Sequence, residues 1–172
     1  MKIYIGLAAP NGGFVPFAWL IQAVLKKKYD HCYIRFQEPA GEWMIFQASG
    51  FAVNIYNVDI WKSANISVKE YEIDLTTEQA AGPDSLWEFI KSRLGLPYSL
   101  KEDFGILLMK IFKLKNNPYA AGGSAEICSQ LAADTCKFLG IDIAQNTATI
   151  DPSTLDSILS NKNFPFVENP VL

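Results

Sequence analysis

The sequence predicts an α+β fold in which an antiparallel sheet packs against helices. Over much of the first half, apolar and polar residues alternate in short segments, a pattern typical of half-buried strands. In the second half, apolar residues recur every three or four positions, as on one face of a helix. Strands and helices are thus segregated along the chain, which indicates the α+β class. The 172 residues are 49% hydrophobic and 19% charged, a composition that suits a single domain over residues 1–172.

The expected strands are short segments separated by turn-forming residues. The first ends shortly before Pro10 and two glycines, and Glu38-Pro39-Ala40-Gly41 forms the turn between the second and the third. The expected strands cover residues 2–8, 31–37, 43–48, 51–58 and 66–75, and a last extended stretch covers residues 164–168.

The expected helices begin and end at recognisable residues. Pro16 suits the first turn of one helix, Asp84 is placed to cap the next, and Gly95 is placed to end it. The helices are expected at residues 16–28, 85–94, 103–114 and 126–140, with a short one after Asp151-Pro152.

The register of the second and third strands follows from their apolar faces. A turn centred on Pro39 keeps apolar residues opposite apolar residues, whereas a shift by one residue reverses every side chain. The cross-strand pairs expected from this turn are Cys32–Phe46, Ile34–Met44 and His31–Gln47.

Charge and cysteine content argue against several classes of protein. The net charge is −3 and there is no basic stripe, so nucleic acid is not an expected partner. The run Lys26 to Lys28 is expected to be the solvated end of a helix. Three cysteines without a CxxC pair, together with a single histidine, indicate neither a disulfide framework nor a metal site, and no cofactor is expected.

The sequence shows no sign of export or of membrane insertion. No apolar run approaches the ~20 residues of a membrane span, so no integral membrane segment is expected. The apolar run Met1 to Ala9 is interrupted at Pro10 and is not expected to be a signal peptide. A protein that is cytoplasmic at synthesis fits best, and a phage or effector protein delivered by other machinery is a further hypothesis.

Cys128 is a candidate nucleophile because of its place at the start of a helix. Gly122 and Gly123 precede it in a loop, and the helix dipole favours a thiolate in the first turn. Backbone N–H groups at that position can also face an oxyanion. The alternative interpretation is a small core residue, since free cysteines are often buried.

His31 is the candidate base, and Gln47 is the candidate residue to orient its ring. The register above lets the Gln47 amide hydrogen-bond the imidazole, as the third member of a catalytic triad does. Gln47 is uncharged and stabilises an imidazolium less than a carboxylate would. Asp30 competes for this role, but adjacent strand residues point to opposite faces. Both residues also fit a structural interpretation: His31 as an isolated, satisfied histidine and Gln47 as a polar strand residue.

Three further residues could belong to such a site. Cys32 is expected to face the core, and Cys136 is expected to be buried two helical turns beyond Cys128. Tyr29 could supply a second oxyanion donor, although packing is its expected role.

The order of these features resembles the permuted branch of the NlpC-like papain superfamily. In that branch the histidine comes first, on a strand, and the cysteine comes late, on a helix. Tyr29-Asp30-His31 matches the family base, and Ile127-Cys128-Ser129-Gln130-Leu131 matches the nucleophile. Gly95-Leu96-Pro97-Tyr98 is similar to the turn that often precedes the cysteine helix, and Asp151-Pro152-Ser153-Thr154-Leu155 is similar to the element after it.

The resemblance covers about residues 14–158 and has one clear departure. Gln47 stands where many members carry Glu. The resemblance implies a circularly permuted papain-like fold and a cysteine peptidase or amidase. It also implies Cys128 as nucleophile, His31 as base and Gln47 as the third member.

Three functions follow as hypotheses. The first is a thiol hydrolase that cleaves an amide bond through a Cys128 thioester, with peptidoglycan peptides as a candidate substrate. The second is a lipid-directed thiol acyltransferase or thioesterase, suggested by the apolar run from Phe104 to Met109 and the lysines that follow it. Exposure of that helix would favour the lipid substrate, and burial would favour the peptide. The third is a non-catalytic binding or structural module, which a sealed pocket over Cys128 would favour.

Overall fold

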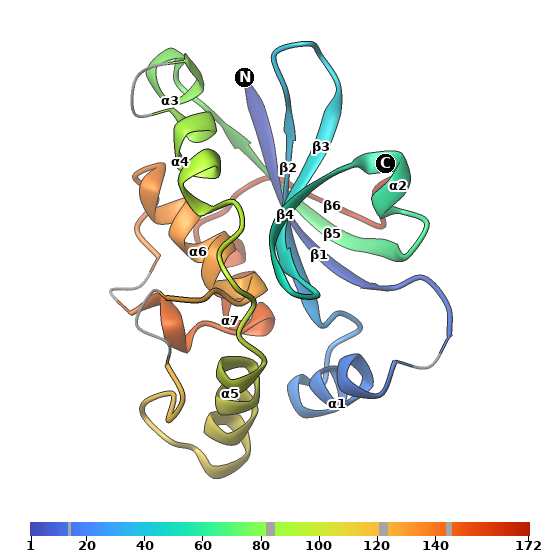
Figure 1. Ribbon diagram of the computed structural model, residues 1–172, viewed down its shortest axis with the longest axis vertical. Helices are drawn as coiled ribbons and strands as arrows, with labels where there is room; N and C mark the ends of the chain where they lie inside the picture. The colour runs from blue at the N-terminus through green and yellow to red at the C-terminus, as the bar shows by residue number, and fades with distance from the viewer. Residues whose placement is uncertain (14, 82–84, 121–123, 144–145) are drawn as a thin grey trace.

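The computed structural model describes residues 1–13, 15–81, 85–120, 124–143 and 146–172. Within these residues the chain is α+β, with a six-stranded antiparallel sheet in the order β4–β3–β2–β1–β5–β6 (Figure 1). The strands are β1 (Lys2–Pro10), β2 (His31–Gln37), β3 (Trp43–Ser49), β4 (Ala52–Asn57), β5 (Asn65–Asp74) and β6 (Phe166–Glu168).

The helices include three short ones that their sequences did not predict. They are α1 (Pro16–Leu25), α2 (Val58–Trp61), α3 (Thr77–Ala81), α4 (Leu86–Arg93), α5 (Leu100–Phe112), α6 (Cys128–Phe138), the 3₁₀ turn η1 (Thr147–Thr149) and α7 (Pro152–Asn161). α2, α3 and η1 have at most five residues, too few to show a helical period. Gly95 ends α4 with a φ of 81°, as expected. Asp84 lies outside the described residues, and Ser85 is the N-cap of α4.

Most of the core lies between the sheet and the helices α4, α6 and α7. Figure 1 shows these helices on one side of the sheet and α2 on the other. Cys32, Ile34 and Phe36 of β2 point into the larger core, as their alternation predicted. Tyr33 points to the opposite face, where its ring lies 4.5 Å from that of Trp61 on α2.

The register of β2 and β3 differs by two residues from the prediction. Ile34 pairs with Phe46, and Phe36 pairs with Met44. The turn is centred on Ala40 because Gly41 takes the positive φ of 98° that the turn requires. An even shift leaves each side chain on its predicted face. Gln47 therefore lies on the same face as His31, but diagonal to it rather than directly opposite.

The ring of Tyr33 occupies the space above Gly6 in β1. A Cβ atom at position 6 would lie 2.0 Å from a ring carbon of Tyr33, which is impossible without a shift. The Tyr33 hydroxyl donates to the Glu70 carboxylate at 2.9 Å and contacts the Ser67 hydroxyl at 2.5 Å. The absence of a side chain at Gly6 thus lets β1, β2 and β5 share one buried polar cluster.

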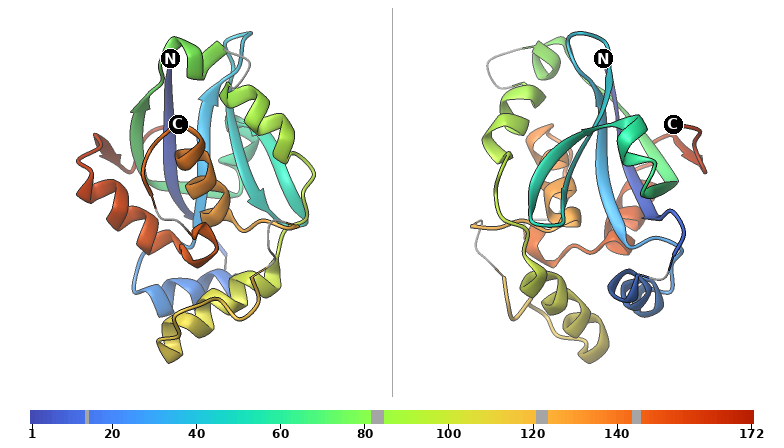
Figure 2. Two further views of the ribbon diagram at one scale, coloured as in Figure 1. Left: turned by 90° about the vertical axis from the view of Figure 1, so that its left-hand side faces the viewer. Right: turned by 45° about the vertical axis from the view of Figure 1, so that its right-hand side comes forward.

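α1 and α5 lie together at one end of the molecule, beyond the ends of the strands. They are in contact with each other, and both views of Figure 2 place them at the same end. Among the described residues, no helix is both long enough and apolar enough to cross a membrane.

Candidate functional site

Cys128 is the first residue of α6, and its side chain is 3% exposed. The sequence placed the start of this helix near Glu126, two residues too early. The backbone N–H of Leu131 bonds the carbonyl of Ile127 at 3.0 Å, which makes it the first intrahelical donor. The N–H groups of the preceding three residues have no acceptor within the helix and can face an anion. Gly122 and Gly123 lie outside the described residues.

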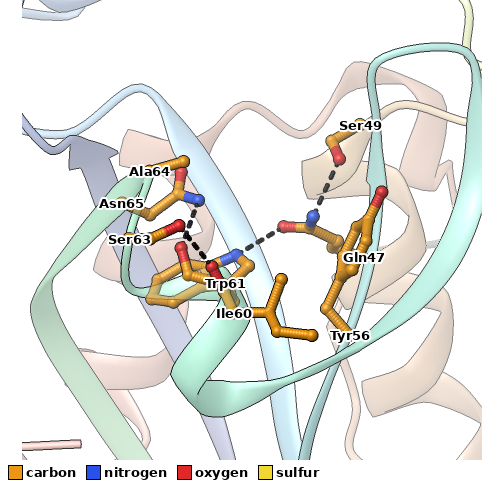
Figure 3. Close-up of a pocket in the computed structure, with 8 residues that line it drawn as sticks. All are labelled: Gln47, Ser49, Tyr56, Ile60, Trp61, Ser63, Ala64 and Asn65. Carbon is orange, nitrogen blue, oxygen red and sulfur yellow. Dashed lines mark hydrogen bonds between the residues drawn. The ribbon is translucent and has the colours of Figure 1, made fainter.

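His31 is the first residue of β2, and its ring is held by Gln47. The Nε2 atom of His31 lies 2.7 Å from the Oε1 atom of Gln47. The same Oε1 accepts the indole N–H of Trp61 at 2.8 Å, and the Gln47 amide nitrogen donates to the Ser49 hydroxyl at 2.8 Å (Figure 3). The structure therefore brings His31 and Gln47 together, as the sequence predicted.

These bonds fix the tautomer of His31. An indole N–H can only donate, so the Gln47 atom that it meets must be the carbonyl oxygen. That oxygen can only accept, so the Nε2 atom of His31 must carry a proton. Because Gln47 occupies Nε2, Nδ1 is the ring nitrogen left for the neighbouring Cys128. A proton exchanged with Cys128 would therefore be held on Nδ1.

The charges of Cys128 and His31 stabilise each other. Hydrogen bonding from Cys32, followed by the charge and hydrogen bonding of His31, outweighs burial and lowers the pKa of the Cys128 thiol well below its usual value. Burial opposes a charge on His31, but the charge of Cys128 and the hydrogen bonds to Cys128 and Gln47 raise the pKa of its imidazole. The site therefore favours a thiolate beside an imidazolium.

Cys32 is buried in the larger core, as predicted, and it also contacts Cys128. Burial and the neighbouring Cys128 raise the pKa of the Cys32 thiol well above its usual value. Cys32 thus keeps its proton and donates it toward Cys128. All three cysteines are free thiols, and burial raises the pKa of Cys136 to about 12.

Asp30 binds Gln22 on α1 rather than the ring of His31. Its Oδ1 atom accepts the Gln22 amide N–H at 2.7 Å. Burial raises the pKa of its carboxyl group. The bond ties α1 to the residue that precedes the candidate base, so Asp30 positions the helix over the site.

A second carboxyl group lies beside Cys128. Asp103 of α5 is buried, and burial together with the Cys128 charge raises its pKa to about 8. The Tyr98 hydroxyl donates to it. Asp103 is therefore largely protonated at neutral pH and can itself donate a hydrogen bond.

Two hollows that share lining residues lie beside Gln47, and His31 lines one of them. One, of about 280 Å³, is lined by His31, Asp30 and Ile21 among others. The other, of about 310 Å³, shares Gln47, Ser49 and Asn65 with it (Figure 3). Cys128 lines a much smaller hollow of about 10 Å³. Asp30 and Ile21 line both this small hollow and the one beside His31, so they form the partition between the thiol and the larger space.

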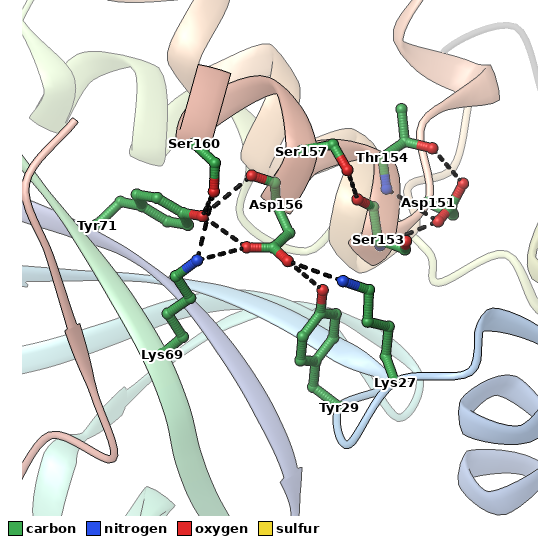
Figure 4. A network of polar contacts seen from close by, with 10 residues as sticks. All are labelled: Lys27, Tyr29, Lys69, Tyr71, Asp151, Ser153, Thr154, Asp156, Ser157 and Ser160. Carbon is green, nitrogen blue, oxygen red and sulfur yellow. Dashed lines mark hydrogen bonds and ion pairs between the residues drawn. The ribbon is translucent and has the colours of Figure 1, made fainter. Parts of the chain in front are cut away.

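Tyr29 does not supply an oxyanion donor. Its hydroxyl donates to Asp156 on α7 at 2.6 Å (Figure 4). Lys69 also donates to this carboxylate, at 3.0 Å, and Tyr71 does so at 2.5 Å. Hydrogen bonds from Tyr29, Tyr71 and Lys69 outweigh burial and lower the pKa of Asp156 to about 2. This network anchors the chain just before His31 to α7 and β5.

Trp61, Asp103 and Tyr98 are site residues that sequence reasoning missed. Trp61 lies on a four-residue helix without a periodic signal, fourteen positions from Gln47. Asp103 lies in the first turn of α5, where a carboxylate is ordinarily explained by the helix dipole. The turn Gly95-Leu96-Pro97-Tyr98 was singled out, and a search for hydroxyl donors near it could have identified Tyr98.

Comparisons with known proteins show a likeness of fold. No family model matches the chain, and no curated protein matches it. The chain is similar to the crystal structure of the metalloprotein YiiX from Escherichia coli O157:H7 (DUF1105), with a TM-score of 0.54 and 17% identity. The match covers 98% of this chain and 87% of the other, so the two share a fold. Within the described part of this chain, no group of three or more His, Cys, Asp or Glu side chains could hold a metal ion.

Proposed function

We propose that this chain is a thiol hydrolase in which Cys128 is the nucleophile, His31 the base and Gln47 the residue that orients it. The observation that carries the proposal is the hydrogen bond between His31 Nε2 and Gln47 Oε1, because it leaves Nδ1 for the thiol. An amide suits this role, since papain-like proteases use Cys, His and Asn. A circularly permuted papain-like fold is part of the same proposal, supported by a histidine at the start of β2 and a cysteine at the start of α6.

The proposed reaction is acyl transfer to Cys128. His31 takes the thiol proton at Nδ1, and the thiolate forms a bond to the substrate carbonyl carbon. The N–H groups at the start of α6 stabilise the resulting oxyanion. The imidazolium then gives its proton to the leaving amine, which departs and leaves a thioester. Water, deprotonated by His31, hydrolyses the thioester and restores the thiol. The proposed bond is an amide, with peptidoglycan peptides as the first substrate to test.

The lipid-directed alternative is supported by the exposed side of α5. Leu100, Phe104 and Ile111 are all exposed, although Ile106 and Leu107 of the same helix are buried. An apolar exposed face is the feature expected of an acyltransferase or thioesterase that meets a lipid. A non-catalytic module is the other alternative, and the burial of Cys128 is the observation in its favour.

The thiol itself provides the first test. Wild type and His31→Ala are alkylated with iodoacetamide between pH 5 and 10, and each cysteine is quantified by peptide mass spectrometry. We expect Cys128 of the wild type to react with an apparent pKa well below the ordinary ~8.5, and this reactivity to be lost in the variant.

Cys136 serves as the control in the same molecule, because its pKa is raised to about 12. If Cys128 reacts as slowly as Cys136 and is indifferent to His31, the hydrolase proposal fails and the binding module becomes the better explanation. If the Cys–His pair is reactive, amide and acyl-ester substrates are compared directly.

A further inference from the structure

α1 exposes several of its apolar side chains to solvent. Gln22 is the one polar residue of α1, and Ala18 is its one buried residue. Trp19 is 58% exposed, and Leu20 is also exposed. Helices on the surface of a protein in water normally turn charged or polar residues outward. On α1 the side chains turned outward are apolar instead.

α5 repeats this pattern next to α1. Leu100, Phe104 and Ile111 recur at helical spacing on its exposed side, and Phe112 is 66% exposed. The opposite side of the same helix, which includes Ile106 and Leu107, is buried. Because α1 and α5 are in contact at one end of the molecule, their exposed residues concentrate there (Figure 2).

Lysines border the apolar residues of α5. Lys101 lies in its first turn, and Lys113 and Lys115 follow its last turn; all three are exposed. Within the described ranges, none of the three forms an ion pair with a carboxylate. This local excess of positive charge occurs in a chain whose net charge is −3.

We infer that α1 and α5 form a docking surface for an anionic lipid bilayer. Apolar and aromatic side chains enter the boundary between headgroups and acyl chains, while the lysines stay at the level of anionic headgroups. A second copy of the chain is a poorer occupant, because a symmetric contact would bring lysine against lysine.

This surface is independent of the chemistry of Cys128, but its place has a consequence for it. Ile21 and Leu25 of α1 and Ile106 and Leu107 of α5 line the small hollow that Cys128 also lines. A bilayer bound to these two helices would therefore lie next to the residues that cover the Cys128 thiol.

Sedimentation with vesicles tests the inference on the full chain. Vesicles of phosphatidylcholine alone are compared with vesicles that contain 30% phosphatidylglycerol. We expect the wild type to bind the anionic vesicles about tenfold more tightly than the neutral ones, and binding to weaken with added salt. The double variant Trp19→Gln/Phe112→Gln is expected to lose at least about a hundredfold in binding, because it removes both aromatic rings from the apolar boundary of the bilayer.

Ile60→Gln is the matched control, since Ile60 is 63% exposed but lies on α2. It is expected to bind vesicles like the wild type, and circular dichroism checks that all variants fold. Failure of the wild type to bind anionic vesicles, or equal binding by the double variant, would overturn the inference. A dimer in analytical ultracentrifugation that dissociates in the double variant would overturn it as well, in favour of a second copy. Cys128 alkylation is measured separately, so a failure here is distinct from a failure of the proposed function.

Discussion

The Nε2 atom of His31 and the Oε1 atom of Gln47 lie 2.7 Å apart on the neighbouring strands β2 and β3. The bond orients the imidazole and stabilises its protonated form. A hydrogen bond to a charged group contributes roughly 1.5–3 kcal/mol, which corresponds to about 10- to 100-fold in a rate constant.

Replacing Gln47 tests this relationship. In Gln47→Leu the ring loses its acceptor, and we expect alkylation of Cys128 at pH 7 to slow by about 10- to 100-fold. Gln47→Glu keeps an acceptor for both His31 and Trp61 and adds a negative charge. We expect its imidazolium to persist to higher pH and its thiol to stay reactive. A Leu variant that reacts like the wild type would contradict an orienting role for Gln47.

Cys32 offers a second test of the charge on Cys128. Its thiol is the largest contribution to the lowered pKa of Cys128. Cys32→Ala removes this donor, so we expect the pH profile of Cys128 alkylation to move to higher pH. Cys32→Ser keeps an O–H donor of similar size and is expected to retain most of the shift. Identical profiles for the two variants would show that Cys32 acts only through packing.

Asp156 is expected to make stability depend on pH in the acid range. Its pKa is lowered to about 2 in the folded chain, whereas an unfolded Asp titrates near ~3.9. A depressed pKa contributes stability above the unfolded value and loses it as pH falls through the folded value. Asp156→Asn is therefore expected to lower the free energy of unfolding at pH 7 by about 2 kcal/mol, with the difference vanishing toward pH 2.

Urea denaturation between pH 2 and 7 measures this difference. Asp59→Asn is the control, because Asp59 pairs with Lys62 through a side chain that is almost wholly exposed. The free energy of unfolding of this variant should change with pH in the same way as that of the wild type. A constant difference between Asp156→Asn and the wild type across the whole pH range would rule out the titration of Asp156 as the cause.

Gly6 is expected to be irreplaceable as long as Tyr33 is present. Gly6→Ala forces the Tyr33 ring away from β1 and disturbs its hydrogen bond to Glu70. We expect a loss of roughly 1–3 kcal/mol in the free energy of unfolding. In a Tyr33→Ala background the same change should cost much less, and a double-mutant cycle measures the coupling. If Gly6→Ala lowers the free energy of unfolding equally in both backgrounds, the strain does not come from the contact with Tyr33.

The sequence predicts the strands well because their alternation is strong. The bounds of β2 agree with the expected range, and the faces of Cys32 and Tyr33 are as predicted. The turn before β3 was misplaced because Pro39 and Gly41 are both turn residues, and only the observed backbone distinguishes them. The contact between His31 and Gln47 was nonetheless correct, since an even shift keeps both on one face.

The rest of the site depends on contacts that local sequence does not encode. Trp61 reaches Gln47 only because a four-residue helix turns back over the sheet. Cys32 contacts Cys128 because α6 packs on β2, a contact between segments almost a hundred residues apart. Tertiary packing of this kind has no periodic signature, so residue patterns indicated the proposed nucleophile and base but not the groups that shift their pKa values.

The narrow space around Cys128 bears on the fate of any acyl group that it carries. About 10 Å³ admits roughly one water molecule. A thioester there would meet few competing solvent molecules, and its acceptor would have to enter past Asp30 and Ile21 from the larger hollow. Whether the thioester is hydrolysed or transferred to an amine or alcohol would then depend on which acceptor fits past these two residues, rather than on the concentration of each acceptor in bulk solvent. Smaller side chains in place of Asp30 and Ile21 would widen the path to Cys128 and shift the products toward the free acid that hydrolysis releases.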